Sequence, residues 1–459
     1  MSLALQLPAI GATSVSAGAV VAAVLGAAAV IAGLVVVMRA NPDAFPLLAV
    51  LALPFRLPIS AEGRTVNLLI PLYLVVGAGV LAHLLPRVLR REERGPGTLE
   101  WLLFASLALY ALQTLYSSDR GKAAENLAFF YVPFALLFVL LRDVDWRREL
   151  LLRCLGIAVA LALIFAGIGF VEYARKELFL NPKVVAANQF DNYFRVNSLF
   201  FDPNVYGRFL ALVMIAVTAV VLWWRNMRGV LAAAAVLAWL LAGLVTSFSQ
   251  SSIAALLLGL AVLAAYRWSL RGTLYVAAAL VALALAVVLL APASSHFGLK
   301  GSGGSANNAT TGRAKLVEGG LELFVDRPLQ GYGSGSFQKE YESHSKASVE
   351  NATSASHTIP ITVAAEQGIV GLALYVALLV VAFLVLFTGA GRSPPRIAIA
   401  ACFAALVLHT FAYADFLEDP LTWTLLGIGI ALARAGAGEA REQTAPRSGD
   451  AAGSGVSGE

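Results

Sequence analysis

Charged residues are scarce in this chain. Asp, Glu, Lys and Arg make up 13% of its 459 residues, about half of the roughly 25% that is usual in soluble domains. Apolar residues make up 59%, so the polar side chains cannot cover a surface that faces water. These proportions exclude a soluble globular enzyme. Cysteine is scarce too: Cys154 and Cys402 both lie in apolar segments, which excludes a disulfide framework and a cysteine-based metal site.

The excess of basic over acidic residues is small, 33 against 28, which gives a net charge of +5. The basic residues lie in short loops between apolar runs and form no continuous basic surface. This distribution argues against nucleic-acid binding.

Long apolar runs fill most of the chain, and a transmembrane helix needs roughly 20 such residues. The sequence therefore predicts an all-α, polytopic membrane protein with roughly 12–13 transmembrane helices. The expected spans are 15–38, 44–58, 66–86, 99–116, 122–141, 151–171, 203–224, 229–246, 251–268, 271–292, 358–388, 397–414 and 419–434. Pro46 and Pro54 interrupt the second run, and whether 15–38 and 44–58 both cross stays open.

The loops rich in arginine predict the orientation. With this set of spans they all fall on one side of the membrane, and the positive-inside rule assigns that side to the cytoplasm. These loops lie at 87–94, 142–153, 225–228, 267–271 and 392–396. The C-terminus is then cytoplasmic, and the segments 173–202 and 293–357 face outward. The second is one large extracytoplasmic loop expected to carry short helices.

Helical spacing of apolar residues appears inside the larger outer loop. Leu316, Leu323 and Phe324 predict an amphipathic helix at 313–325 that lies on the membrane surface. The chain accordingly divides into N-terminal transmembrane helices at 1–172, a second region at 173–434 that holds both outer loops, and a tail at 435–459. The tail is rich in Ala, Gly, Ser and charge, and we expect it to be disordered and cytoplasmic.

Three arginines in the outward segments are candidate phosphate ligands. They are Arg195, Arg313 and Arg327. Outward loops normally carry few basic residues, and a guanidinium fits phosphate oxygens bidentately. Two or three such groups at the membrane surface would hold a pyrophosphate whose lipid tail stays in the bilayer. The alternative is ordinary snorkelling of long side chains at the interface.

His357 is the best candidate for a general base, because it lies where the large outer loop meets the next apolar run. An imidazole can take a proton near neutral pH. His83 and His409 lie inside spans, where packing or a hydrogen bond between helices is the simpler interpretation. His296 and His344 lie elsewhere in the outer loop, where a surface position is expected.

Charged residues near the expected spans need partners. Glu366 should face a polar cavity or pair with a neighbour, because an acid inside a membrane is costly. Arg208 is expected to pair with an acid such as Glu366 or Asp202. The segment "YADFLEDP" supplies Asp415, Glu418 and Asp419, and a solvated acidic loop is the simplest interpretation, with a sugar or divalent-ion site as the alternative. The stretch "GYGSGSF" lacks the Lys-Ser/Thr of a P-loop and predicts a turn.

Four blocks in order resemble the bacterial O-antigen ligase and O-antigen polymerase superfamily. The first is "FRVNSLFFDPNVYGRFLAL", with Arg195, Asp202, Pro203 and Asn204. The second, "VTSFSQSSIAALLLGL", is similar to a Ser-Arg-Gly helix start. The third is "GRAKLVEGGLELFVDRPLQGYGSGSF", with Arg313, Pro328, Gly331, Gly333 and Phe337. The fourth is "SHTIPITVAAEQGIVGL", with His357, Glu366, Gly368 and Gly371.

The resemblance implies transfer of a glycan from an undecaprenyl-pyrophosphate carrier to the hydroxyl of a glycan or glycolipid acceptor, on the outer face of the cytoplasmic membrane. It implies no metal and no other cofactor. It makes His357 the base and Arg195 and Arg313 the pyrophosphate ligands, with Arg327, Asn204 and Gln250 as further substrate-binding residues. Gln250 and Thr358 depart from the pattern, since they stand where an arginine and an asparagine are usual. Repeat-unit polymerisation by the same superfamily is the alternative. A transporter or flippase of lipid-linked sugars is less favoured, because we see no internal repeat.

Overall fold

The computed structural model describes residues 17–61, 64–91, 95–179, 194–223, 227–272, 275, 305–345, 358–413 and 415–444. Its helices in chain order are α1 (Ala17–Ala40), α2 (Ala44–Ala52), α3 (Ile70–Gly79), α4 (Leu85–Arg90), α5 (Thr98–Thr114), α6 (Arg120–Asn126), α7 (Val132–Arg142), α8 (Arg148–Arg175), α10 (Pro203–Trp223), α11 (Met227–Thr246), α12 (Gln250–Arg267), α14 (Ser305–Asp326), α15 (Phe337–Ser345), α16 (Ile359–Phe387), α17 (Pro394–Ala412) and α18 (Pro420–Thr444).

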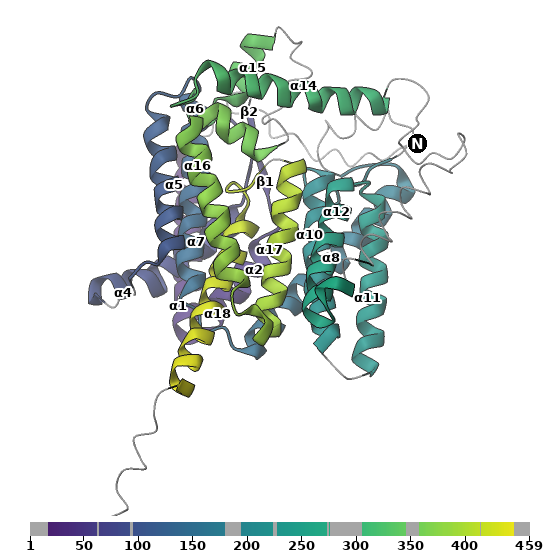
Figure 1. Cartoon of the computed structure of the whole chain (residues 1–459). Coiled ribbons are helices and arrows are strands. Elements are labelled where there is room, and N and C mark those ends of the chain that lie inside the picture. The colour runs from purple at the N-terminus through teal and green to yellow at the C-terminus, as the bar shows by residue number, and fades with distance from the viewer. Residues whose placement is uncertain are drawn as a thin grey trace, which may run out of the picture.

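Ten helices within the described ranges are long and apolar enough to cross a membrane, and they form one bundle (Figure 1). This confirms the predicted all-α, polytopic membrane architecture. Two of the ten are composite: a π-helical turn at Val80–Leu84 joins α3 to α4, and another at Leu127–Tyr131 joins α6 to α7. Each turn lies just before a proline, Pro86 or Pro133, whose missing N–H interrupts the regular ladder of hydrogen bonds.

Helix α5 also crosses the bundle, although its 17 residues extend only about 25 Å. Near its start, Glu100 contacts Arg142 and Arg434 at one end of the bundle. Just beyond its other end, Ser117 donates a hydrogen bond to the carbonyl oxygen of Ser334, which belongs to the large loop at the opposite end.

The expected helical span at 44–58 is wrong. Only α2 forms there, with nine residues, and an antiparallel hairpin of β1 (Leu57–Ala61) and β2 (Arg64–Leu68) follows it. Pro54 and Pro58 lack the N–H donor that a continuing helix requires. The hairpin carries the chain toward the end of the bundle where α14 lies (Figure 1). The predicted span at 271–292 lies outside the described residues, except for 271, 272 and 275.

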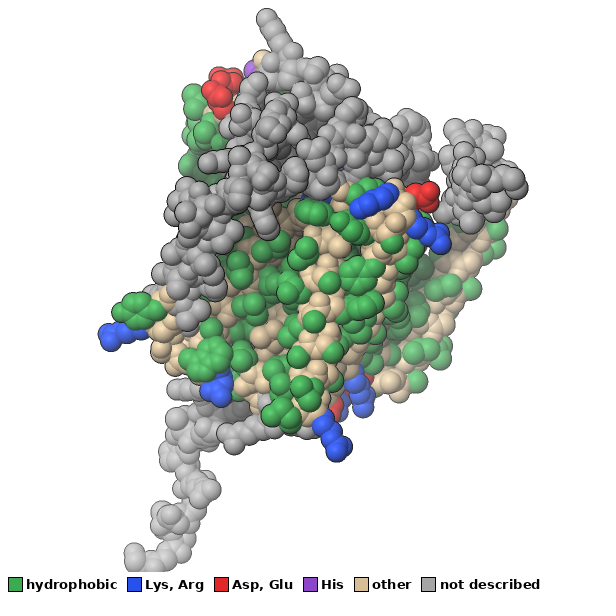
Figure 2. Space-filling view, turned by 90° about the vertical axis from the view of Figure 1, so that its right-hand side faces the viewer, with side chains coloured by type: hydrophobic (Ala, Val, Ile, Leu, Met, Phe, Trp, Pro, Cys, Tyr) green, Lys and Arg blue, Asp and Glu red, His purple; other side chains and the backbone are tan. Residues whose placement is uncertain are grey.

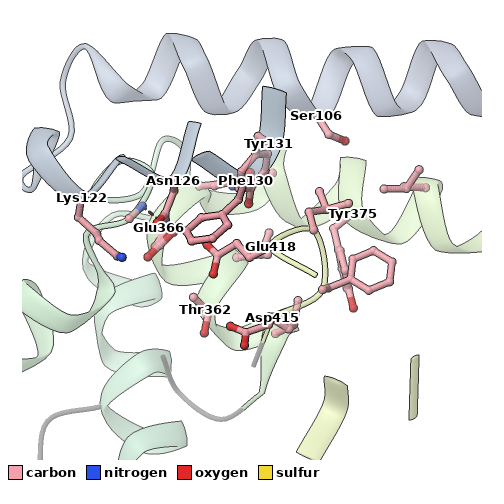
Figure 3. A pocket seen from close by; sticks show the side chains of 18 of the residues that line it. Ser106, Lys122, Asn126, Phe130, Tyr131, Thr362, Glu366, Tyr375, Asp415 and Glu418 are labelled. Atoms are coloured by element: carbon pink, nitrogen blue, oxygen red, sulfur yellow. Dashed lines mark hydrogen bonds between the residues drawn. The ribbon is translucent and has the colours of Figure 1, made fainter. Parts of the chain in front are cut away.

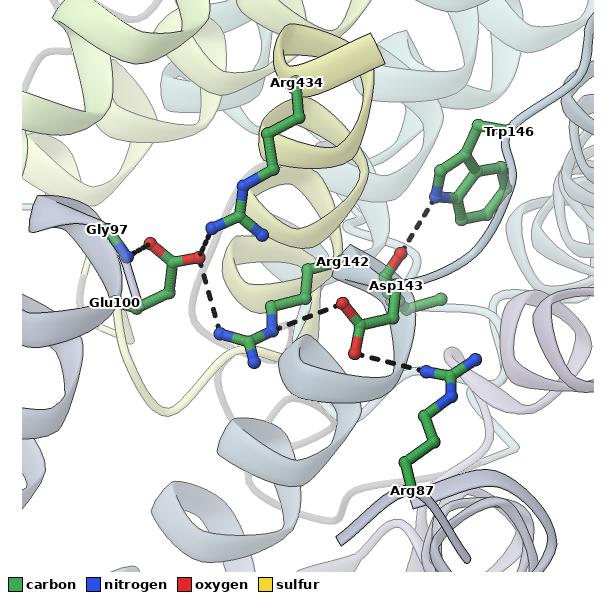
Figure 4. A network of polar contacts seen from close by, with 8 residues as sticks. Arg87, Gly97, Glu100, Arg142, Asp143, Trp146 and Arg434 are labelled. Atoms are coloured by element: carbon green, nitrogen blue, oxygen red, sulfur yellow. Dashed lines mark hydrogen bonds and ion pairs between the residues drawn. The ribbon is translucent and has the colours of Figure 1, made fainter. Parts of the chain in front are cut away.

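The predicted grouping of the basic loops holds in the structure. Arg87 forms an ion pair with Asp143 at 3.2 Å, and Glu100 lies between Arg142 and Arg434 (Figure 4). Two further contacts connect the remaining loops: Arg267 Nε donates to Leu222 O at 3.2 Å, and Tyr266 Oη donates to Phe387 O at 3.4 Å. We call this the basic end, and the end that carries α14 and α15 the loop end.

Hydrophobic side chains cover the middle of the bundle on the face that Figure 2 shows, and arginine and lysine side chains lie along its lower rim and at its upper edge. Helix α10 lies at the centre, packed against α8, α11, α12 and α17, and most of its side chains from Pro203 to Ala219 are buried. A polar residue on α10 therefore needs a partner from a neighbouring helix or loop.

Helix α14 confirms the predicted helix at 313–325 but extends further toward the N-terminus. Its surroundings differ from the prediction of a helix on lipid: Leu316 and Leu323 are buried in a small core with residues of α15 and α16. Val325 is exposed. The apolar face of α14 thus anchors the loop to the bundle because α15 and α16 supply a protein surface for it.

Candidate functional site

A cavity of about 320 Å³ opens among α5, α6, α16 and the segment between α17 and α18 (Figure 3). Its polar lining residues are Arg56, Ser106, Lys122, Glu125, Asn126, Tyr131, Thr362, Glu366, Gln367, Tyr375, Asp415 and Glu418. Phe130, Val363 and Phe416 are among its apolar walls. Its size lies near the lower end of the about 300–1,000 Å³ that small-molecule sites occupy.

Glu366 lines this cavity and fixes the neighbouring loop. Its carboxylate accepts hydrogen bonds from the backbone N–H groups of Gly335 at 2.9 Å and Phe337 at 3.0 Å. Phe337 begins α15, and a carboxylate is favourable at a helix N-terminus. Both expectations for Glu366 are therefore met: it faces a polar cavity, and it pairs with a neighbour.

The turn predicted for "GYGSGSF" is confirmed, because Gly331, Gly333 and Gly335 all have positive φ. This turn lies against a break in α16 at Gly368, where φ is 64°. A Cβ atom at Gly368 would lie 2.3 Å from the carbonyl oxygen of Leu329, and one at Gly331 would lie 2.3 Å from that of Glu366. Glycine is required on both sides, since any side chain would separate the two backbones.

The acidic loop "YADFLEDP" is not a solvated loop. Asp415 and Glu418 line the cavity, and Asn126 Nδ2 donates to Glu418 Oε1 at 2.9 Å. Burial, together with the nearby Asp415, raises the pKa of the Glu418 carboxyl from 4.5 to about 8. Burial also raises the pKa of Asp415. The cavity therefore holds at least one carboxyl group that is largely protonated at neutral pH.

Lys122 and Glu125 form an ion pair at 2.7 Å on the wall that α6 supplies. Sequence reasoning missed this wall because it lies in the N-terminal half, far from the blocks of the family pattern. The available signal was the cluster of polar residues in "KAAEN", at the start of an otherwise apolar run.

Arg195 and Asn204, both predicted substrate ligands, lie together at the loop end. Arg195 Nε donates to Ser247 O at 3.2 Å, and its Nη2 donates to Asn204 Oδ1 at 3.3 Å. Ser249 Oγ donates to the same Asn204 oxygen at 2.9 Å and caps α12 by accepting from Ser252 N. Arg195 is not among the residues that line the cavity. The side chain of Gln250, next to this cluster in sequence, is exposed.

The partner predicted for Arg208 is wrong. Arg208 is 1% exposed and forms an ion pair with Asp419 at 2.5 Å, and it pairs with neither Glu366 nor Asp202. Asp419 precedes α18 and reaches α10 because α17 brings the acidic loop back beside the centre of the bundle. Asp202 instead caps the start of α10, where its Oδ1 accepts from Asn204 N at 2.6 Å.

The other predicted site residues are scattered or lie outside the described part of the chain. Arg327 is exposed and lies over the ring of Tyr332, 4.3 Å from its centroid. Arg313 belongs to α14, but its side chain is outside the described residues. His357, the predicted base, also lies outside the described residues. Ile359, two residues after His357 in sequence, lines the cavity, and Thr358 Oγ1 donates to Phe411 O at 3.3 Å.

His409 confirms the expected hydrogen bond between helices, because its Nε2 lies 3.2 Å from Ser251 Oγ on α12. Within the described ranges, no three His, Cys, Asp or Glu side chains gather in the arrangement that a metal ion requires.

The O-antigen ligase family model matches residues 235–376. The matched region begins in α11, includes the turn at 331–337 and ends in α16, so it contains Glu366, Gly368 and part of the cavity wall. No curated protein matches the chain. The match covers three of the four blocks of the resemblance; the first block, with Arg195 and Asn204, lies before it. The match supports membership of this chain, a multi-pass helical membrane protein, in the O-antigen ligase and polymerase superfamily.

Proposed function

We propose that this protein transfers a glycan from an undecaprenyl-pyrophosphate carrier to the hydroxyl of a glycan or glycolipid acceptor. The observation that carries the proposal is the polar cavity near the loop end, whose wall includes Gly335, Glu366 and Gly371 from the matched region. A hollow of this kind inside an apolar bundle is the expected place for a hydrophilic headgroup attached to a lipid.

Arg195 and Arg313 are the proposed ligands of the pyrophosphate, with Arg327, Asn204 and Gln250 as further substrate contacts. The bond between the anomeric carbon and the phosphate oxygen breaks, and the lipid pyrophosphate leaves with the electron pair. Guanidinium groups stabilise the charge that develops on it. Asn204 supports this role for Arg195, because its amide oxygen accepts from the guanidinium.

His357 is the proposed general base. It takes the proton of the acceptor hydroxyl while that oxygen forms the new bond to the anomeric carbon. Glu366, Arg208 and Asp202 act through structure in this scheme: Glu366 holds the glycine-rich turn, Arg208 pairs with Asp419, and Asp202 caps α10. The reaction as proposed uses no metal and no other cofactor.

The positive-inside rule assigns the two ends of the bundle to the two sides of the membrane. The grouping of the basic loops at one end supports a cytoplasmic basic end, with the C-terminus on that side and the cavity facing outward. The region 173–434 is then the catalytic part, but Arg56, Ser106 and Lys122 also line the cavity. Residues 1–172 would thus contribute to the site as well as to the membrane anchor.

The test is analysis of surface and lipid-linked glycans in a deletion strain complemented with variants of this chain. His357→Ala should lower transfer by at least about 100-fold, the effect of losing a general base, with expression and membrane insertion unchanged. Arg195→Ala should also lower transfer. The matched control is His344→Ala, because His344 lies in the same large loop and its side chain is 43% exposed.

Retained transfer in His357→Ala would remove His357 from the mechanism, and no transfer by the wild-type chain would reject the function. The products also separate the two reactions of the superfamily. Long lipid-linked chains indicate a polymerase, whereas a capped acceptor indicates a ligase.

A further inference from the structure

The cavity contains more acidic than basic groups. Glu125, Glu366, Asp415 and Glu418 line it, against Arg56 and Lys122, and Lys122 already forms an ion pair with Glu125 at 2.7 Å. A pyrophosphate would meet four acidic side chains here and two cations, one of which is already paired, in a partly buried place where charges are poorly screened. The cavity lining is therefore unsuited to the leaving group of the proposed reaction.

The arginine that suits a pyrophosphate lies elsewhere. Arg195 contacts Ser247 and Asn204 near the ends of α10 and α11 and does not line the cavity. The loop that carries Asp415 and Asp419 contacts both regions, since Asp415 lines the cavity while Asp419 pairs with Arg208 on α10, the helix that also carries Asn204.

Two buried polar side chains of the cavity wall have unused hydrogen-bonding atoms. Asn126 and Tyr375 are 4% and 5% exposed, and neither Asn126 Oδ1 nor Tyr375 Oη has a hydrogen-bond partner in the described chain. The Asn126 amide nitrogen is fully used, because it donates to Tyr110 and to Glu418. Leaving such an atom unpaired is unfavourable, so a ligand hydroxyl that reaches either atom would be stabilised.

We infer that this cavity is the subsite for an uncharged sugar unit, separate from the place where the pyrophosphate binds. The inference rests on the proposed function and adds to it the chemistry of the group in the cavity. A sugar hydroxyl both donates and accepts, which matches a wall of carboxyl groups, an amide and a guanidinium. The rings of Phe130, Tyr131 and Phe416 supply the apolar surface that the C–H face of a sugar needs.

Glu418 is the residue on which to test this subsite. Its carboxyl, with a pKa of about 8, can donate a hydrogen bond as well as accept one at neutral pH. Glu366 is unsuitable, because its carboxylate holds the backbone of the glycine-rich turn and its loss would disturb the fold. Thr362 supplies a second test, since Thr362→Val removes a hydroxyl from the cavity wall with little change in shape.

The experiment is saturation-transfer NMR on the full chain in lipid nanodiscs, with glucose and N-acetylglucosamine as probes and inorganic pyrophosphate as competitor. We expect at least one sugar to bind, and Glu418→Ala to weaken that binding about tenfold, the effect of one lost hydrogen bond. Thr362→Val should weaken it less. Arg195→Ala should leave sugar binding unchanged, and Asp145→Asn, at the basic end, is the control.

The inference is overturned if no sugar binds, if Glu418→Ala and Thr362→Val both bind the sugar as the wild type does, or if pyrophosphate displaces the sugar competitively. The glycan analysis reports separately on the proposed function. If sugar binding depends on Glu418 but the chain shows no transfer activity, the sugar subsite is retained and the transferase function is rejected. If the chain transfers glycans but binds no sugar, the transferase function is retained and the subsite is rejected.

The sugar unit could belong to the donor or to the acceptor. In a transfer assay with purified protein, Thr362→Val should raise the KM for the substrate whose sugar occupies the cavity. A higher KM for the lipid-linked donor identifies the donor sugar, and a higher KM for the acceptor identifies the acceptor sugar.

Discussion

At the basic end of the bundle each buried carboxylate lies between arginines, whereas near the loop end four carboxyl groups share a cavity with two cations. Glu100 contacts both Arg142 and Arg434 and also accepts from Gly97 N (Figure 4). In the cavity, Glu418 has an asparagine as its hydrogen-bond partner. Charges that are neutralised on all sides hold helices together, while polar groups left around a hollow are available to bind a ligand.

The Arg208–Asp419 pair should give the largest effect on stability, because both of its side chains are almost fully buried. Asp419→Asn leaves an uncompensated guanidinium in the centre of the bundle. We expect it to lower the free energy of unfolding by about 3–5 kcal/mol, measured by thermal unfolding of the protein in detergent. The double variant Arg208→Met, Asp419→Leu removes both charges and should recover most of the loss. An unchanged Tm in Asp419→Asn would contradict the central role of the pair.

The cavity end depends on close contact between backbones, which glycine variants can break. Gly368→Ala places a Cβ atom 2.3 Å from Leu329 O in a backbone with φ of 64°. We expect a loss of about 1–3 kcal/mol from backbone strain, and a clear loss of glycan transfer because Glu366 and the turn at 331–337 must shift. The matched control is Gly26→Ala in α1, where a Cβ atom meets nothing within 4 Å. If Gly368→Ala and Gly26→Ala lose the same stability and the same transfer activity, close contact between the two backbones does not explain the loss.

Removing a charge at the basic end should lower the stability of the protein and leave its transfer activity unchanged. Glu100→Gln weakens the contacts with Arg142 and Arg434, and we expect it to lower the free energy of unfolding by about 1.5–3 kcal/mol. Transfer by the folded protein should stay within about twofold of the wild type, since Glu100 lies at the opposite end from the cavity. Asp145→Asn is the control, because Asp145 is 89% exposed and should change stability by less than about 0.5 kcal/mol. A specific loss of activity in Glu100→Gln would weaken the contrast between the two ends.

The smallest expected effect is a difference in pH dependence. Because the pKa of Glu418 rises from 4.5 to about 8 on folding, the folded state retains a proton that the unfolded state loses between these pH values. Stability therefore falls as pH rises through this window. Glu418→Gln should leave Tm nearly unchanged at pH 4, below both pKa values, and raise it at pH 9, above both, by on the order of 2 °C. The buried Asp415 titrates beside Glu418 and should preserve part of the slope. A Tm difference that is the same at both pH values would count against a raised pKa.

Helices, their approximate limits and the common end of the basic loops could be predicted from local sequence, because hydropathy and charge act on each segment separately. The run at 44–58 shows the limit of that approach: its composition suits a span, but Pro54 and Pro58 divert the chain into a hairpin. The turn at 331–337 and the need for a partner at Glu366 could be anticipated as well. The identity of that partner could not, since it is a pair of backbone N–H groups about 30 residues away along the chain.

The sequence by itself determined that this is a helical membrane protein with one strongly basic end and with motifs similar to those of the O-antigen ligase family. Only the tertiary structure decided which polar groups meet. Asp419, not Glu366 or Asp202, neutralises Arg208, and Asn126 reaches Glu418 across 292 positions of sequence. The physical reason is that embedding a segment in lipid depends on its own side chains, whereas a buried charge is stabilised by whichever groups the packed helices bring within a few ångströms.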